Sequence, residues 1–160
     1  MNKKMVIIAT IVLIFDQIFK SIAQIYDVNI NIISHVFRLN YYQNTGAAWS
    51  ILEGEQTLLI VVTFIMLVLI FNMMYSYEDN KLNNIAFGLL IGGIIGNLID
   101  RVFYAYVRDF IELIVFGYNF PIFNIADMGI VIGVILIIIS TIKGEFKNGV
   151  KSRRKLNKNW

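Results

Sequence analysis

The chain has 160 residues, of which 58% are hydrophobic and only 16% are charged, and its net charge is +3. Soluble domains carry about 25% charged residues, so this composition argues against a soluble enzyme and against a disordered chain. The chain has no cysteine and a single histidine, His35, which excludes disulfides, cysteine nucleophiles and multi-histidine metal sites. Any catalysis must therefore rely mainly on carboxylates.

Four stretches are apolar enough to cross a membrane as helices, for which about 20 residues are needed. They lie near 5–25, 57–77, 83–103 and 124–142. The second and third have long uncharged runs, whereas the first and the fourth carry ionisable groups.

The first stretch has some features of a secretory signal peptide, because two lysines precede its apolar run and Ser21-Ile22-Ala23 imitates a cleavage site. Asp16 and Lys20 interrupt the region just before that site. We therefore expect an uncleaved membrane-spanning helix.

Basic residues gather at the two ends of the chain. The tail over 143–160 holds seven bases and one acid, and Lys3 and Lys4 lie near the N-terminus. Because basic flanks stay in the cytoplasm, both termini are predicted to be cytoplasmic. The tail is also expected to contact anionic lipid headgroups, so the positive charge does not call for a nucleic-acid partner.

Two segments, 26–56 and 104–123, are then predicted to lie outside. Residues 29–42 are rich in Ile, Val, Phe and Tyr, which indicates short strands at the membrane surface. Residues 110–123 are apolar and aromatic with turn residues, which is typical of a segment lying in the membrane interface. The predicted fold is a four-transmembrane-helix bundle with a small extracytoplasmic β-rich loop domain, and residues 1–160 form a single integral membrane domain.

Several polar residues lie inside the predicted spans, where a charge costs about 2.5–3.5 kcal/mol and so suggests a function. Asp16 and Lys20 are four residues apart, share one helix face and can pair. In the third span Asn97 can reach Arg101, and Asp100 lies near both. Structural ion pairs are the alternative interpretation of both groups.

Glycines recur at helical spacing in two of the spans. These glycine rows are Gly88, Gly92 and Gly96 with the adjacent Gly93 in the third span, and Gly129 with Gly133 in the fourth. Small residues at this spacing favour close contact between membrane helices.

The fourth span begins at Asn124, which is a good N-cap residue, and Asp127 lies in its first turn, where a carboxylate favours the helix dipole. Capping alone can explain both residues. Asp109 follows the third span and, as a surface residue, would pair with Arg108 or Arg101. Asn44 lies in the first outer segment, before a glycine turn.

With this topology the polar residues converge on the outer side of the membrane. Two or three carboxylates beside a water-filled cavity can share a proton, and such a pair activates water against an amide bond. The residues by themselves leave open whether Asp100 or Asp109 is the partner of Asp127.

The sequence resembles the bacterial lipoprotein signal peptidases, the signal peptidase II family, over nearly its whole length through about Ile142. Five blocks in order carry the resemblance: Asp16-Gln17-Ile18-Phe19-Lys20, Asn44-Thr45-Gly46-Ala47-Ala48-Trp49, Gly92-Gly93-Ile94-Ile95-Gly96-Asn97-Leu98-Ile99-Asp100-Arg101, Val107-Arg108-Asp109-Phe110-Ile111 and Phe123-Asn124-Ile125-Ala126-Asp127. The resemblance implies an aspartyl endopeptidase that removes the signal peptide of a prolipoprotein, N-terminal to a diacylglyceryl-modified cysteine. It implies no cofactor and no metal.

By the same resemblance, Asp109 and Asp127 are the catalytic pair. The substrate-binding or supporting residues that it implies are Asn44, Asn97, Arg101, Asn124, Asp16, Lys20, Gly93 and Asp100. Asp16 and Lys20 would fix the first helix against the site, and Asp100 would be a structural partner of Arg101. Arg108 departs from the family pattern, which has an apolar residue there, and its charge would lower the pKa of Asp109.

Two other classes of protein compete with a peptidase. A proton- or ion-coupled transporter subunit would use intramembrane Asp, Lys and Asn, but a transport path must be lined across the whole membrane, and here the polar groups lie on one side. A membrane scaffold protein would explain the glycines but not the clustered carboxylates.

Overall fold

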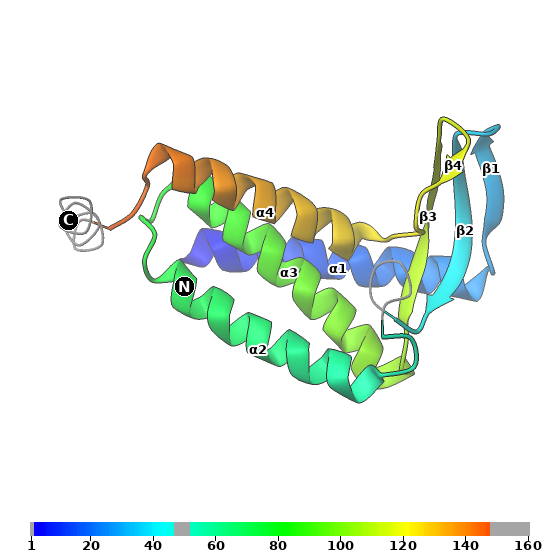
Figure 1. Cartoon of the computed structure of the whole chain (residues 1–160), viewed down its shortest axis with the longest axis horizontal. Helices are drawn as coiled ribbons and strands as arrows, with labels where there is room; N and C mark the ends of the chain where they lie inside the picture. Colours follow the sequence, from blue (N-terminus) through cyan, green and yellow to red (C-terminus); the bar gives the residue numbers. More distant parts are fainter. Residues whose placement is uncertain (1, 47–51, 148–160) are drawn as a thin grey trace.

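The computed structural model describes residues 2–46 and 52–147. Ala47, Ala48 and Trp49 of the second block, and residues 148–160 of the basic tail, lie outside the described residues. The elements in chain order are α1 (Lys3–Ile25), β1 (Asn29–Ile33), β2 (Phe37–Asn44), α2 (Gln56–Met74), α3 (Lys81–Tyr104), β3 (Val107–Val115), β4 (Tyr118–Asn119) and α4 (Ile125–Lys143). The four helices form one bundle, and the strands run across one end of it (Figure 1).

All four helices are long and apolar enough to cross a membrane. Their bounds match the predicted spans within a few residues, except that α2 ends at Met74, three residues early. Tyr77 is instead buried beyond the helix end, where its ring packs on Phe87 and Phe146 and its hydroxyl lies 2.6 Å from that of Thr141.

Helix α3 is the centre of the bundle. Of its most apolar 18-residue stretch, 72% is buried, whereas the corresponding share is 28% or less in the other three helices. The predicted glycine rows form its contacts. A Cβ at Gly92 would lie 2.6 Å from the carbonyl oxygen of Ala9 in α1, and one at Gly133 of α4 would lie 2.8 Å from that of Ala86. Only glycine permits these close approaches, as the spacing predicted.

The sheet has the order β1-β2-β3-β4 and is antiparallel throughout. The two strands predicted within 29–42 are present as β1 and β2. The segment after α3, for which only an interfacial location was predicted, contains strand β3 and the short strand β4. The first four residues of β3 are buried, so this strand lacks the alternation of polar and apolar residues that marks a half-exposed strand.

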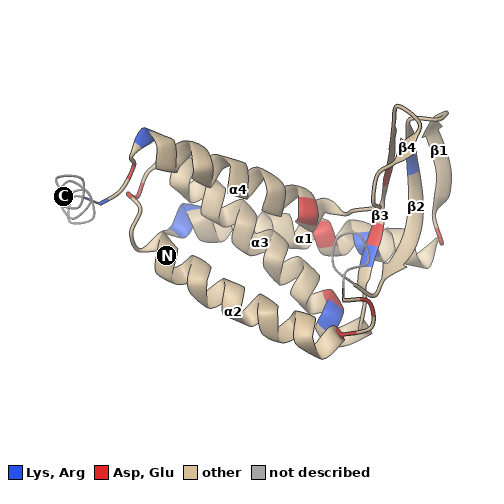
Figure 2. Cartoon of the chain, viewed as in Figure 1, with Lys and Arg blue, Asp and Glu red and all other residues tan. Residues whose placement is uncertain are grey.

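Charged side chains lie toward the two ends of the bundle, and the helix segments between them carry none (Figure 2). Helix α2 has no charged residue over its whole length. Both ends hold acids and bases, but among the described residues the buried charged side chains all lie at the end that meets the sheet, so the functional site is to be sought there.

Candidate active site

A cavity of about 1350 Å³ opens between α2, α3, α4 and the neighbouring strands. Its long apolar wall includes Val62, Ile94 and Val134. Its polar lining near the sheet includes Asn44, Asn97, Arg101, Asp109, Glu112 and Asp127. Five of the predicted site residues therefore line one cavity, whereas Asp100 does not.

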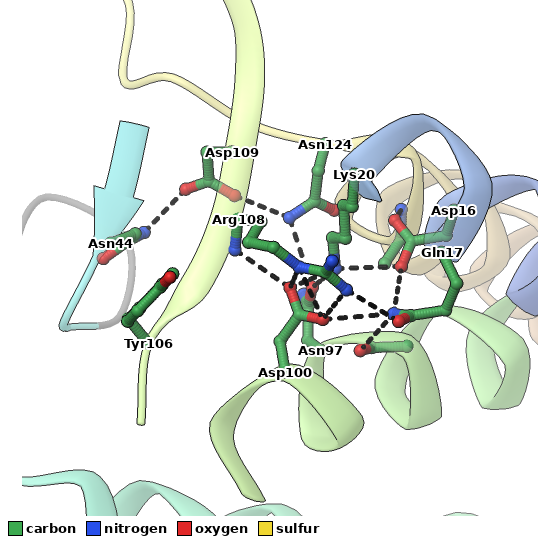
Figure 3. A network of polar contacts seen from close by, with 12 residues as sticks. Asp16, Gln17, Lys20, Asn44, Asn97, Asp100, Tyr106, Arg108, Asp109 and Asn124 are labelled. Carbon is green, nitrogen blue, oxygen red and sulfur yellow. Dashed lines mark hydrogen bonds and ion pairs between the residues drawn. The ribbon is translucent and has the colours of Figure 1, made fainter. Parts of the chain in front are cut away.

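Strand β3 carries Asp109, whose side chain is 1% exposed. Both carboxyl oxygens accept hydrogen bonds, one from the Asn44 amide at 2.9 Å and the other from the Asn124 amide at 2.6 Å (Figure 3). Burial and the nearby charge of Asp127 raise the pKa of Asp109 to about 7. The expected lowering by Arg108 is wrong, and so is the pairing of Asp109 with Arg108 or Arg101.

Asp127 lies in the first turn of α4, where it completes a capping box with Asn124. The Asp127 backbone N–H donates to the Asn124 side chain at 2.9 Å, and a carboxyl oxygen of Asp127 accepts the Asn124 backbone N–H at 3.2 Å. The other carboxyl oxygen accepts the Asn97 amide at 2.7 Å. Capping and a place in the cavity are thus compatible roles for this carboxylate.

The two carboxylates are linked through the buried Asn124. Its amide nitrogen donates to Asp109 and also to the side-chain oxygen of Asn97, at 3.2 Å. That oxygen accepts a second hydrogen bond from Lys20 at 2.8 Å. Because both donors occupy the Asn97 oxygen, the Asn97 amide nitrogen is directed at Asp127.

A buried ionic cluster adjoins these residues through Lys20 and Asn97, and Figure 3 shows it beside Asn124. Lys20 pairs with Asp16 at 2.8 Å, as predicted, and with Asp100 at 3.3 Å. Asp100 also pairs with Arg108 at 2.7 Å. The expected pairing of Asp100 with Arg101 is wrong, since the Arg101 guanidinium donates to the Gly46 carbonyl at 3.1 Å.

Arg108 and Gln17 are members of this cluster that the sequence interpretation did not assign to the site. Arg108 donates to Gln17, Ser21 and Gln24 of α1, and it lies over the Tyr104 ring at 4.4 Å. The sequence did indicate a polar helix face for such a contact, because these three α1 residues recur at i, i+4 and i+7 beside the face that carries Asp16 and Lys20.

Gly93 contributes to the site by its lack of a side chain, which lets the α4 backbone come close. A Cβ there would overlap the carbonyl oxygen of Ala126, so glycine lets α3 approach the first turn of α4, next to Asp127. Over the described residues, no three His, Cys, Asp or Glu side chains are grouped so as to hold a metal ion.

Comparison with known proteins shows the family of the chain. The family Signal peptidase (SPase) II matches residues 8–143. The chain belongs to this family. Lipoprotein signal peptidases of Staphylococcus aureus strains bovine RF122 / ET3-1 and MRSA252 are each 43% identical over 143 residues, which cover 86% of this chain and 87% of the relative.

Solved structures extend this similarity to the fold. A bacterial membrane enzyme determined by the in meso method at 2.3 Å resolution has a TM-score of 0.78 and 41% identity, covering 87% of both chains. A second, at 1.9 Å resolution, has a TM-score of 0.76 and 41% identity, covering 87% of this chain and 92% of the other. The predicted family and fold class are confirmed, and the chain is a multi-pass membrane protein.

Proposed function

We propose that the chain cleaves prolipoproteins as an aspartic endopeptidase, with Asp109 and Asp127 as its catalytic pair. As a member of the signal peptidase II family it is a protease that removes the signal peptide from a prolipoprotein, N-terminal to the lipid-modified cysteine. The family gives no support to the transporter alternative. The catalytic type and the residue roles are our proposal.

The observation that carries the proposal is the arrangement of the two carboxylates. They come from different elements, line the same cavity and both accept hydrogen bonds from Asn124, Asp109 from its side-chain amide and Asp127 from its backbone N–H. Each has both oxygens fixed by hydrogen bonds from N–H donors. Such a pair is preorganised to hold a water molecule and a peptide carbonyl between two acidic groups.

The chemistry requires one carboxylate with a proton and one without. The raised pKa of Asp109 favours this state, because burial and a neighbouring negative charge both disfavour a second ionised group. The ionised carboxylate takes a proton from water, and the resulting hydroxide attacks the scissile carbonyl carbon while the protonated carboxyl donates to its oxygen. Collapse of the tetrahedral intermediate breaks the C–N bond: the carboxyl group that took the proton from water gives it to the departing amine, and the other carboxylate recovers its proton from a hydroxyl group of the intermediate.

The remaining polar residues orient the pair or the substrate. Asn44, Asn97 and Asn124 hold the carboxylates by the hydrogen bonds described above. Arg101 lines the cavity, and within the described part of the chain its Nε has no hydrogen-bond partner. This Nε is itself buried, so we assign the Arg101 guanidinium as a whole to binding of the substrate backbone.

The test is cleavage of a diacylglyceryl-modified precursor by purified Asp109→Asn and Asp127→Asn variants. Each change is nearly isosteric and removes the ionisable group, so each should lower turnover by at least about 10²–10⁴-fold without loss of folding. Asp79→Asn is the control, because Asp79 lies at the opposite end of the bundle, where its carboxylate accepts hydrogen bonds from Asn2 at 2.7 Å and Asn84 at 2.8 Å. This control should retain its kcat.

A further variant, Asp100→Asn, separates the two candidate partners of Asp127. It should keep residual activity per folded molecule, because Asp100 is committed to Lys20 and Arg108. The comparison must be made per folded molecule, since an unpaired buried charge destabilises the protein. If folded Asp100→Asn is inactive while Asp109→Asn turns over normally, the pair is Asp100 with Asp127.

A further inference from the structure

The residues directly before the two proposed catalytic residues are held in the same way, through their backbone N–H groups. The backbone N–H of Ala126, which precedes Asp127, donates to a carboxyl oxygen of Asp16 at 2.9 Å. The backbone N–H of Arg108, which precedes Asp109, donates to a carboxyl oxygen of Asp100 at 2.9 Å. Each aspartate of the pair is therefore anchored by a second, buried aspartate that does not line the cavity.

These two anchoring carboxylates are joined by one cation. The Lys20 ammonium lies 2.8 Å from Asp16 and 3.3 Å from Asp100, and all three side chains are fully buried. The Gln17 amide bridges the same two carboxylates, at 3.2 Å from each. An unbroken path of short contacts thus runs from the backbone N–H of Arg108 to the backbone N–H of Ala126.

Arg108 completes the charge balance of this path. Its guanidinium contacts Asp100 through Nε and one terminal nitrogen, and its other donors are taken by side chains of α1. With Asp16, Lys20 and Asp100 it makes a cluster of two acids and two bases. A neutral, fully bonded cluster tolerates burial, whereas removal of one member leaves an uncompensated charge.

We propose that Asp16, Lys20 and Asp100 form an ionic strut that sets the separation of Asp109 and Asp127. The inference rests on the proposed catalytic pair. The three members are positioning residues, because they act on the pair through the backbone and through Asn97. A displacement of about 1 Å between reacting groups costs roughly 10²-fold in rate, so the strut has a kinetic consequence as well as a structural one.

The test is a double-mutant cycle of Asp16→Asn and Asp100→Asn, with kcat and KM measured per folded molecule on a diacylglyceryl-modified precursor peptide in detergent. Each single variant should lower kcat by about 10–10²-fold with little change in KM. The kcat of the double variant should be close to that of the less active single variant, because the same strut is broken in all three variants. Losses that multiply in the double variant, or an unchanged kcat in both single variants, would overturn the strut.

Ser140→Ala is the control for a purely structural effect. Ser140 is fully buried toward the end of α4 remote from Asp127, and its hydroxyl donates to Asn83 at 2.5 Å. This variant should lower the thermal midpoint and keep kcat unchanged. A drop in kcat equal to that of the strut variants would show that loss of stability alone explains them, and would also overturn the proposal.

Gln17→Met keeps the proposal testable if the Asn variants do not fold, because it removes a bridging amide without unbalancing buried charge. It should lower kcat at constant KM, and an unchanged kcat would contradict the strut. The catalytic pair is tested separately, because normal turnover by Asp109→Asn and Asp127→Asn would overturn the pair. If those two variants are inactive while the strut variants keep their full kcat, the strut alone is overturned.

Discussion

At the scale of single residues, the neighbours Arg108 and Asp109 have opposite environments because they lie on opposite faces of one strand. The Arg108 side chain is directed at α1 and α3, while Asp109 faces the cavity. Adjacent side chains of a strand alternate between its faces. Although Arg108 is adjacent to Asp109 in sequence, its positive charge therefore does not prevent the rise in the pKa of Asp109.

The pH dependence of cleavage follows from that pKa. Asp109 is protonated below about pH 7 and ionised above it, so the pair loses its shared proton as the pH rises. We expect kcat/KM to fall along an alkaline limb near pH 7. A pH–rate profile of the purified enzyme in detergent measures it, and activity that keeps rising from pH 7 to pH 9 would contradict the prediction.

The sequence identified the residues that meet at the site better than it identified their partners. Asp16 with Lys20 and Asn124 with Asp127 were predictable, because i, i+4 and capping geometry are local. The partner of Asp100 was not, since Arg101 is adjacent in sequence but a helix directs consecutive side chains to different sides. The true partners, Lys20 and Arg108, depend on how α1, α3 and β3 pack together.

At the scale of elements, the helices were predictable and one strand was not. A run of about 20 apolar residues has few structural alternatives in a membrane. Strand β3 is paired with β2 and packed against helices, so its buried residues run together without alternation. Asp109 follows α3, as expected, but its place within a sheet, opposite Tyr42, was not predicted.

The glycine rows give a test of helix packing. Gly92→Ala should destabilise the protein by about 1–3 kcal/mol, because the new methyl group would lie 2.6 Å from a backbone oxygen of α1 that cannot move aside. Gly129→Ala is the matched control, since its nearest neighbour would be at 3.1 Å. Thermal unfolding in detergent should rank Gly92→Ala as the less stable variant, and the reverse ranking would show that the α1–α3 contact is not the tighter one.

At the scale of the whole molecule, the bundle separates a charge-free middle from two charged ends, and the charged residues that line the cavity lie at the end that carries the sheet. The orientation of that end in the membrane, and the organisation of residues 1–160 as one domain, stay predictions. The basic residues at the opposite end favour a cytoplasmic position for both termini.

Labelling of single cysteines tests this orientation, because the natural chain contains no cysteine. Glu53→Cys should react with a membrane-impermeant maleimide in intact cells, as it is exposed in the loop before α2. Lys147→Cys, exposed after α4, should react only after permeabilisation. The opposite pattern would place the site in the cytoplasm.

The cavity also predicts how the substrate lipid contributes to recognition. Its apolar wall continues from the carboxylates between α2 and α4, as far as Met73 and Ile138. A diacylglyceryl group on the substrate cysteine can lie along this wall and in the adjoining bilayer while the peptide bond reaches the carboxylates. Each methylene that leaves water contributes about 0.8 kcal/mol, so a few carbons change affinity strongly.

We therefore expect kcat/KM to fall steeply as the acyl chains of a model precursor are shortened, with most of the loss in KM. The peptide sequence is kept constant along the series, and the unlipidated peptide is its limit. Because the lipid does not contact the carboxylates in this arrangement, kcat at saturation should change much less than KM. Equal kcat/KM for lipidated and unlipidated peptides would show that the apolar wall does not bind the lipid.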